Sequence, residues 1–465
     1  MKKLYAAAAA MILLGIIAFG ANAILMDHVQ DLRQQEEYPG RDMVNSAPAD
    51  LEDLRNLGIE PFVSAIPVIM IDTMDQQLTE NEKREVSLAV YDHSSGENDI
   101  LGNPTAILRG KMKLRGNTDQ EKQQYRLNLM KNHSNKEMNY ALLGMAEDSR
   151  WVLHGPYADR SLLRNYLMYH LSRETMEWAP DCRFFELFLD GKYQGVYLAV
   201  EPVGVGRNRL NLSRFSLVSG NSPCILYRDR IGHETLPIET YGNKVGIIQR
   251  MLDIRYPDPQ FITDTQIKRI TEYISSFEKA LYGKNFKSPV SGYADYIDSQ
   301  SFADYFILNE LAMNRDLGSL SAYVYKDLNG KLSMCVWDFN RAFDNYRAAQ
   351  PTDQWCRPDN TWFTRLLEDP SFCKIVNERY QELRAAVLSD AHIDELIADA
   401  QKQLGDAADR NFIRWNHSFE GYLLNETEGQ HRNPSDYADA LNILKNTIHQ
   451  RLKFMDQSVP KLTGE

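Results

Sequence analysis

The stretch LSMCVWDFNRAFDNY, residues 332–346, holds the most informative break in this chain. An apolar, β-prone run reaches Trp337 and is then interrupted by Asp338-Phe339-Asn340. An aspartate directly after a strand has two ordinary explanations. Its side chain often bonds to the backbone of a turn, and its carboxylate is also a ligand that Mg²⁺ prefers. The residues on either side of this stretch bear on the choice.

A second acid, Asp316, stands before this stretch where another regular pattern ends. Apolar residues three and four apart over residues 299–316 predict a helix, and two apolar runs around Asn329-Gly330 predict a β-hairpin that leads to Asp338. Two carboxylates on loops that flank one hairpin can converge on one Mg²⁺, which needs only one or two of them beside phosphate oxygens. Helix caps and turns, where aspartate is common, remain the alternative.

The segments before this hairpin predict an antiparallel sheet with one helix packed on it. Four strand-like runs, one helical stretch and two strands joined at Asp190-Gly191 follow one another. They occupy residues 66–73, 85–92, 110–117, 125–130, 159–176 and 184–201. From about Gly206 onward the periodicity is mainly helical. The sequence therefore predicts an α+β fold with a sheet in its first half and mostly helices in its second.

Composition and the N-terminus bound the class of protein and its location. A formal net charge of −12 gives no global basic footprint of the kind that marks nucleic-acid binders. Residues 1–23 begin with paired lysines, continue as an apolar run and end at Ala21-Asn22-Ala23, which predicts a signal peptide. An uncleaved membrane anchor is the alternative, and either places the rest of the chain outside the cell. The polar, acidic residues 24–60 predict a tether.

Taken together, these segments resemble the CotH kinase family, atypical kinase-like proteins first associated with spore coats. The resemblance rests on KLRGNT (113–118), YRLNL (125–129), LLGMAEDSRWVLHGPYADRSLLRNYLMYHLS (142–172), FFELFLDGKYQGVYLAVEPV (184–203), RLNL (209–212), NRDLGSLSAYVYKD (314–327) and VWDFNRAF (336–343). It implies an atypical protein-kinase-like fold of two lobes. The expected N-lobe spans residues 61–205, the C-lobe with its metal and catalytic loops spans 206–375, and a helical extension spans 376–465.

The same resemblance implies roles for the acidic residues. Asp338 is expected to be the principal metal ligand, in the place where kinases carry the aspartate of Asp-Phe-Gly. Asp316 matches the catalytic-loop aspartate, as a base or a second metal contact, with Asn314 and Ser321 beside it. Asn340 completes the expected metal set, although the family commonly has another aspartate there, so one negative charge is missing. The implied cofactors are ATP and Mg²⁺ or Mn²⁺.

The resemblance also implies which cations hold the phosphates. The turn of Arg115, Gly116 and Asn117 is expected near them. The family usually has a lysine just before YRLNL, where this chain has Gln124, so Arg126 is the expected replacement. The alternatives are Lys113 and Lys122. An arginine clamps phosphate with two parallel hydrogen bonds and is not interchangeable with lysine.

Three further residues match family positions without a settled role. Arg164 and Asn165 on the helical stretch are expected to orient phosphate or to brace the first lobe. Glu201, which follows an apolar strand, is expected to contact the nucleotide or to cap the connection between the lobes.

The expected function is a secreted or surface-anchored protein kinase that transfers the ATP γ-phosphate to Ser or Thr of extracytoplasmic proteins. Its partners would be ATP and a protein substrate, with no nucleic acid, and with a membrane only through an uncleaved N-terminal segment. A catalytically weak, kinase-shaped binding or assembly module of the cell surface or spore coat is the alternative, because Gln124 and Asn340 depart from the family. A glycosidase with a carboxylate pair fits the acids but not the order of the lobes.

Overall fold

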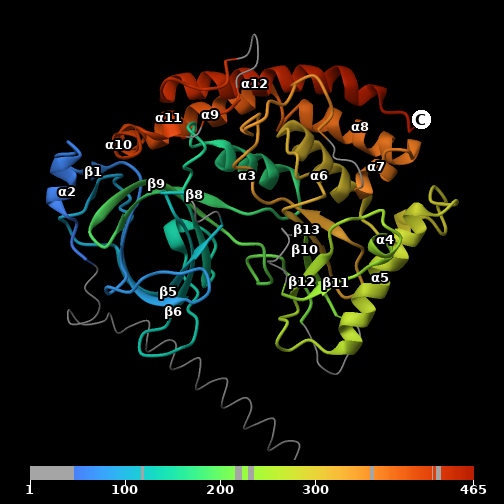
Figure 1. Ribbon diagram of the computed structural model, residues 1–465, viewed down its shortest axis with the longest axis horizontal. Helices are drawn as coiled ribbons and strands as arrows, with labels where there is room; N and C mark the ends of the chain where they lie inside the picture. The colour runs from blue at the N-terminus through green and yellow to red at the C-terminus, as the bar shows by residue number, and fades with distance from the viewer. Residues whose placement is uncertain are drawn as a thin grey trace, which may run out of the picture. The chain divides into compact units, whose positions relative to one another are not determined.

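The computed structural model describes residues 47–116, 120–214, 222–228, 235–356, 361–421, 423–425 and 431–464. The chain divides into two compact units, and all of these residues belong to the unit Ser46–Glu465. Both sheets and helices are present (Figure 1), so the predicted α+β class is confirmed. The expected signal segment over residues 1–23 and the expected phosphate contact Asn117 lie outside the described residues.

Seven strands of the first half form a closed barrel in the order β2-β3-β5-β6-β7-β9-β8. Their bounds are β2 Val68–Asp72, β3 Arg84–Tyr91, β5 Ala106–Arg115, β6 Gln124–Met130, β7 Arg150–His154, β8 Cys182–Leu189 and β9 Lys192–Val200. Neighbours pair antiparallel, as predicted, except that β2 pairs with β8 in parallel and thereby closes the sheet. A two-stranded ribbon of β1 (Val63–Ser64) and β4 (Asn98–Asp99) is separate from the barrel.

Side chains alternate between the interior and the exterior of the barrel. On β5, Met112 is fully buried in the barrel core, whereas Lys113 and Arg115 lie on the opposite, outer face. Helix α3 (Arg164–Thr175) packs on the outer face of β8 and β9, where its Leu167 shares a core with Phe184. On the same outer face, Arg126 of β6 pairs with Lys113 of β5 and is exposed.

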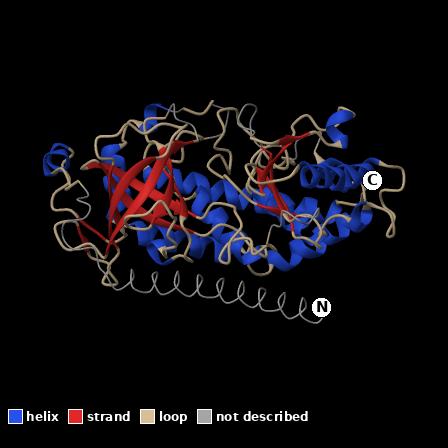
Figure 2. Ribbon diagram, turned by 90° about the horizontal axis from the view of Figure 1, so that it is seen from below, coloured by secondary structure: helices blue, strands red, loops and turns tan. Residues whose placement is uncertain are grey.

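A second, five-stranded sheet has the order β11-β12-β10-β13-β14. Its strands are β10 Cys224–Arg228, β11 Pro237–Ile238, β12 Leu252–Tyr256, β13 Ala322–Lys326 and β14 Ser333–Cys335. The hairpin predicted before Asp338 is present, with Tyr323 opposite Cys335. The other strands of this sheet, β10, β11 and β12, were not predicted, because the periodicity indicated mainly helices in that region. Figure 2 shows the two groups of strands, in red, as separate bodies flanked by helices.

Helices make up most of the remaining structure. They are α4 Tyr241–Lys244, α5 Asp264–Tyr282, α6 Ser299–Leu311, α7 Trp362–Leu366, α8 Pro370–Arg384, α9 Asp390–Leu404, α10 Asp406–Arg414, α11 Ser418–Gly421 and α12 Tyr437–Ser458, with single turns η1 Leu142–Gly144, η2 Tyr293–Asp295 and η3 Val459–Lys461. Helix α6 is capped by Asp298 and is buried along most of its length. Among the described residues, no helix is long and apolar enough to cross a membrane.

The expected tether over residues 24–60 overlaps ordered structure. Helix α2 (Leu51–Asn56) begins after Asp50, whose carboxylate accepts from the N–H groups of Glu52 and Asp53. Leu54 is 1% exposed and belongs to a core with β2 residues such as Val68. Ordered packing in this region therefore begins before residue 61.

Helix α10, which belongs to the expected C-terminal extension, is fastened to the barrel. The side-chain oxygen of Asn411 accepts from the ammonium of Lys122 at 2.7 Å and from the N–H of Val196 at 3.1 Å. Arg410 forms an ion pair with the buried Glu186 at 2.6 Å. Lys122 is 1% exposed and its pKa is lowered well below the usual value by burial, so this lysine is committed to the barrel.

We expect Gly195→Ala to loosen this attachment. Gly195 has φ +81°, and a Cβ there would lie 2.5 Å from the side-chain oxygen of Asn411. Gly246, with φ +74° and nothing near its Cβ position, is the matched control for backbone strain alone. Both variants should lose about 1–3 kcal/mol from strain, and Gly195→Ala should lose more, as measured by urea unfolding. Equal losses would show that the contact with Asn411 is unimportant.

Candidate active site

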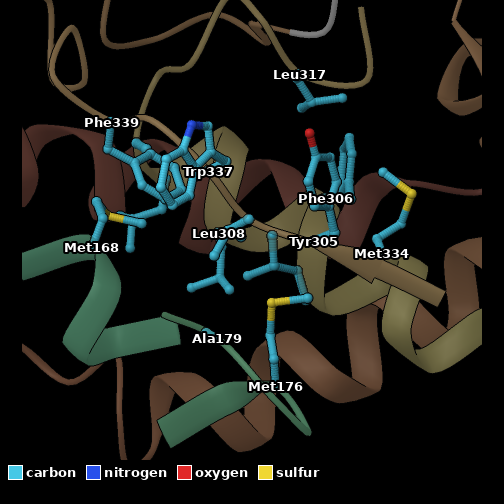
Figure 3. Close-up of a cluster of buried hydrophobic side chains, with 14 of the residues drawn as sticks. Met168, Met176, Ala179, Tyr305, Phe306, Leu308, Leu317, Met334, Trp337 and Phe339 are labelled. Carbon is cyan, nitrogen blue, oxygen red and sulfur yellow. The ribbon is translucent and has the colours of Figure 1, made fainter. Parts of the chain in front are cut away.

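Asp338 lies in a turn that is anchored on both sides by buried aromatic residues. Trp337 is 7% exposed and Phe339 is 1% exposed, and both pack in the main core near Met168 of α3 (Figure 3). Asp338 itself is half-buried and has φ +64°, a left-handed conformation that is costly for a residue other than glycine. The neighbouring side chains therefore fix the direction in which the carboxylate leaves the backbone.

Two side chains of α3 hold the backbone of this turn. The hydroxyl oxygen of Tyr169 accepts from the N–H of Asp338 at 3.2 Å, and the amide oxygen of Asn165 accepts from the N–H of Phe339 at 2.7 Å. Tyr169 and Asn165 are four residues apart, so they project from the same face of the helix. A helix that packs on the barrel thus supports the turn that carries Asp338.

Asp316 lies in a tight turn beyond the end of α6. Its N–H donates to the side-chain oxygen of Asn314 at 3.1 Å, and its backbone carbonyl accepts from the N–H of Ser319 at 2.9 Å. Leu317, the next residue, is fully buried and belongs to the same hydrophobic cluster as Trp337 (Figure 3). One core therefore holds the backbone beside both acids.

Direct hydrogen bonds join the two acidic loops. The N–H of Phe343 donates to the carbonyl of Ala312 at 2.7 Å, and the hydroxyl of Tyr346 donates to the side-chain oxygen of Asn314 at 3.2 Å. The guanidinium of Arg315 donates to the carbonyl of Ala349 at 2.8 Å. The segment after Asp338 is thus bonded to the segment around Asp316 at three separate points.

Tyr346 lies within electrostatic range of both carboxylates. The pKa of its hydroxyl is raised by burial, and the negative charges of Asp316 and Asp338 raise it further. Both carboxylates are therefore close enough to one phenol to act on it. The two predicted catalytic acids thus lie on hydrogen-bonded loops, and both act electrostatically on Tyr346, a residue that the sequence interpretation did not single out.

The backbone of this region is strained at several positions. Among the described residues, five non-glycine residues with positive φ lie within the acidic loops: Met313, Ser321, Asp338, Phe343 and Asp344. Such conformations cost on the order of 1–3 kcal/mol each and are concentrated at functional sites. Ser321, which the sequence interpretation placed beside Asp316, is one of them.

The donor set fits a magnesium or manganese ion that is shared with phosphate oxygens. Asn340 is half-buried, and its backbone N–H donates to a carboxylate oxygen of Asp338 at 3.5 Å. Within the described part of the chain, no group of three His, Cys, Asp or Glu side chains is placed to hold a metal ion. Two carboxylates and an amide suit Mg²⁺, which binds one or two carboxylates and completes its shell with substrate phosphates and water.

Arg115 extends from the barrel toward the Asp338 turn. Its guanidinium lies 5.5 Å from the centre of the Trp337 ring, within the range of a cation–π interaction. The expected phosphate-binding arginine therefore lies beside the aromatic residue that precedes the expected metal ligand.

Arg126 is placed where a bound anion would relieve repulsion. It pairs directly with Lys113 across β5 and β6, and two like charges in that arrangement destabilise a sheet. Its pKa is lowered first by burial and then by the positive charge of Arg115. Arg126 has no hydrogen bond or ion pair with any other described residue, whereas Lys113 donates to the carbonyl of Glu80 at 2.7 Å.

The positive charge around Arg126 extends toward the second sheet. Arg255 of β12 also lowers the pKa of Arg126, and the hydroxyl of Tyr323 opposes this effect. Tyr323 stacks on Tyr227 with ring centres 4.2 Å apart and meets Trp337 edge to face at 6.1 Å. A group of arginines and aromatic rings thus lies between the barrel and the strands that lead to Asp338.

Arg164 and Glu201 are buried and form hydrogen bonds and ion pairs with other residues of the protein. Arg164 donates to the carbonyl of Ala342 at 2.8 Å and is paired with Asp159, so it ties the loop after Asp338 to the start of α3. The carboxylate of Glu201 accepts from Arg209 at 2.5 Å and from the N–H of Asp181 at 3.0 Å. These contacts give Arg164 a bracing role and commit Glu201 to a buried ion pair with Arg209.

His154 supplies a pH-dependent contribution to stability. Burial, reinforced by the positive charge of Arg115, lowers its pKa from 6.5 to about 3, with Asp159 opposing the shift. The unfolded chain therefore binds more protons than the folded chain between these values, so stability falls as pH falls below 6.5. We expect a slope of up to about 1.4 kcal/mol per pH unit from this residue.

The slope is measured by urea unfolding of wild type and His154→Gln at pH 7, 6, 5 and 4. His170, whose pKa is lowered to about 4 by burial, contributes to both proteins, so only the difference between them reports on His154. A wild-type curve that runs parallel to that of the variant would contradict the assignment.

Comparison with known protein families identifies one family that matches this chain. A family model described as CotH kinase protein matches residues 112–455. The matched range contains both acidic loops, Arg115, Arg126 and most of α12. A search of curated proteins finds no match.

Proposed function

The chain belongs to the CotH kinase family, and on that premise we propose that it transfers the γ-phosphoryl group of ATP to Ser or Thr hydroxyls of extracytoplasmic proteins. The observation that carries the proposal is the bonding of two acidic loops to each other beside a pair of arginines. Phosphoryl transfer needs positioning and neutralisation of charge more than covalent chemistry from the protein. The proposal also assigns the barrel as the N-lobe and the second sheet with its helices as the C-lobe.

Each residue of the site has a proposed task. Asp338 is the principal ligand of Mg²⁺ or Mn²⁺, with Asp316 and Asn340 as further contacts. When bound, the ion neutralises charge on the β- and γ-phosphates. Alternatively, Asp316 acts as the base. It accepts the proton of the substrate hydroxyl while the oxygen of that hydroxyl forms a bond to the γ-phosphorus. The bond from phosphorus to the bridging oxygen breaks, and ADP leaves with that electron pair.

The arginines would bind the phosphates. Arg126 fits this task best because the residue is exposed and makes no hydrogen bond or ion pair with another described residue. Arg115 is held over Trp337, one residue from Asp338. A guanidinium binds phosphate with parallel, charge-assisted hydrogen bonds, and so two arginines replace the lysine that the family usually carries.

The extracytoplasmic location rests on the pattern of residues 1–23 alone. A cleaved signal would release the protein, and an uncleaved segment would hold it at the outer face of the membrane. Expression with an N-terminal and a C-terminal tag, followed by mass spectrometry of the mature N-terminus, distinguishes the two forms.

A kinase-shaped binding or assembly module is the second candidate. Gln124 occupies the position of the family lysine, and its side chain is bonded to His154 at 2.8 Å rather than turned to a ligand. Asn340 removes one negative charge from the metal set. Both features would reduce catalysis while leaving a site that binds ATP and a metal ion.

The test is an assay with γ-labelled ATP and a mixture of secreted proteins, with Mg²⁺, Mn²⁺ or a chelator. Metal-dependent labelling supports the kinase, and metal-dependent binding of ATP without labelling supports the module. Neither binding nor labelling would refute both. Binding is followed by thermal shift, since a ligand of the native state raises the melting temperature.

We expect Arg126→Met to weaken binding of ATP–Mg²⁺ by about tenfold or more, because a hydrogen bond to a charged group contributes about 1.5–3 kcal/mol. Arg109→Met is the matched control on the same outer face of the barrel, on the neighbouring strand β5, since Arg109 is already paired with Glu85 at 2.7 Å. Titration of the thermal shift with ATP–Mg²⁺ measures both. Equal weakening in the two variants would remove Arg126 from the site.

A further inference from the structure

A chain of side-chain hydrogen bonds runs from the barrel to the turn of Asp338. The amide oxygen of Gln124 on β6 lies 2.8 Å from Nδ1 of His154 on β7. The other ring nitrogen of His154 lies 3.0 Å from the amide nitrogen of Asn165 on α3. The amide oxygen of Asn165 accepts from the N–H of Phe339 at 2.7 Å. Three side chains from three elements thus connect in single file.

The direction of every hydrogen bond in this chain is fixed by one backbone group. The N–H of Phe339 can only donate, so Asn165 must present its oxygen there and its NH₂ group to His154. Nε2 of His154 must then be an unprotonated acceptor, which puts the ring proton on Nδ1. That proton is donated to Gln124. A glutamine suits this end of the chain because its amide oxygen accepts, whereas a lysine ammonium can only donate.

The three hydrogen-bonded side chains are shielded from water. Gln124, His154 and Asn165 are each 6% exposed. Hydrogen bonds in such surroundings are stronger than in water, and a buried polar group left without its partner is costly. The lowered pKa of His154 agrees with a neutral ring. Replacing one member of the chain therefore disturbs the next and reaches the backbone of Phe339.

We infer that Gln124, His154 and Asn165 are positioning residues that aim the Asp338 carboxylate at its metal ion. This inference rests on the proposed function, since it concerns the metal site of that reaction. The chain holds the N–H that follows Asp338 and so stabilises its left-handed backbone. It also explains the glutamine at position 124, whose amide completes a support for the metal ligand. Hydrogen bonds thereby connect the barrel strands β6 and β7 to the turn that carries Asp338.

The experiment measures Mn²⁺ binding by electron paramagnetic resonance, with transfer of labelled phosphate as a second readout. Asn165→Leu and Gln124→Leu should each weaken Mn²⁺ binding by about tenfold or more, the usual effect of removing a group that orients a metal ligand. Gln124→Glu should retain most of the affinity, because its carboxylate still accepts the proton that Nδ1 of His154 donates. This rescue separates an orienting role from simple packing.

Ser172→Ala is the control on the same helix. Its hydroxyl is buried and donates to the carbonyl of Met168 at 2.6 Å, so the variant loses a buried hydrogen bond without touching the chain. It should bind Mn²⁺ like wild type. Each variant is also checked by its melting temperature, so that loss of folding is not mistaken for loss of a ligand.

The outcomes distinguish the inference from the function on which it rests. If Asp338→Ala loses Mn²⁺ while Asn165→Leu and Gln124→Leu bind it as tightly as wild type, the positioning role is refuted and the metal site stands. If Ser172→Ala loses as much affinity as Asn165→Leu, the effect is general packing and the inference is equally refuted. If wild type itself binds no Mn²⁺, the proposed function fails and takes the inference with it.

Discussion

Asp338→Asn is expected to reduce phosphoryl transfer by about a thousandfold or more. The carboxylate is proposed to hold the ion that neutralises the phosphates, and such charge stabilisation is worth several kcal/mol in the transition state. An amide of nearly the same size leaves the packing of Trp337 and Phe339 intact. The fold should therefore survive while the rate collapses, as measured with γ-labelled ATP at saturating Mg²⁺.

Asp298→Asn is the matched control for this substitution. Asp298 caps α6 through bonds from the N–H groups of Gln300 and Ser301, and asparagine is an equally good cap. Asp298→Asn removes the same charge as Asp338→Asn, but at the N-terminus of α6, whereas Asp316 follows the C-terminus of that helix. This variant should transfer phosphate at the wild-type rate. Wild-type activity in Asp338→Asn would refute the assignment of the metal ligand.

Arg451→Leu is expected to destabilise the protein by about 3–5 kcal/mol, because it leaves a buried carboxylate without its countercharge. The side chains of Arg451 on α12 and Glu310 on α6 are both 0% exposed and are paired at 2.6 Å. The guanidinium also donates to the carbonyl of Glu310 at 2.7 Å and to the carbonyl of Thr352 at 3.0 Å. Urea unfolding with a constant m-value measures the loss.

Two further variants separate charge pairing from packing. Lys453→Met changes an exposed cation on the same helix and should alter stability by no more than about 0.5 kcal/mol. The double variant Arg451→Leu with Glu310→Leu removes both charges and should recover part of the loss, because an apolar pair avoids the cost of a lone buried charge. A loss below about 1 kcal/mol in Arg451→Leu would contradict the pairing.

This ion pair explains what the C-terminal extension does for the site. Glu310 lies one residue before the end of α6, the helix that leads into the Asp316 loop. Helix α12 lies against α6 (Figure 1), and its arginine fixes both the side chain and the backbone there. We therefore expect Arg451→Leu to reduce phosphoryl transfer as well, through the position of Asp316.

Local sequence patterns were sufficient to predict the hairpin and to place Asp316 before it and Asp338 after it. Alternation of apolar residues around Asn329-Gly330 is a short-range signal, and the strands form where it predicted them. The α3 periodicity and the alternation of Lys113 with Met112 have the same local character. Such patterns report which face of an element is buried, and so they also placed Arg115 and Arg126 on the outside of β5 and β6.

The closure of the barrel could not be predicted in the same way. It depends on the parallel pairing of β2 with β8, two strands more than a hundred residues apart, and no local signal encodes that register. The strands β10 to β12 were missed for a related reason. They are short, and β10 is buried at every residue, so it lacks the alternation that identifies a half-exposed strand.

The supporting residues of the site were hidden because their roles arise from long-range contacts. Tyr346 had no distinguishing neighbour in the sequence, yet it bonds to Asn314, and the charges of both acids raise its pKa. His154 ends an apolar strand and matched no metal or catalytic spacing. The resemblance did single out Asn165, but its bond to Phe339 could be seen only once α3 and the hairpin were placed together.

The most direct measurement is a crystal structure of the protein with Mn²⁺ and a non-hydrolysable ATP analogue, with the metal located by anomalous scattering. We expect one manganese peak in direct contact with the Asp338 carboxylate, with Asp316 on the same ion or on a second ion beside it and Arg126 on the phosphates. Manganese bound elsewhere, with the two carboxylates turned to separate protein partners, would contradict a shared metal site.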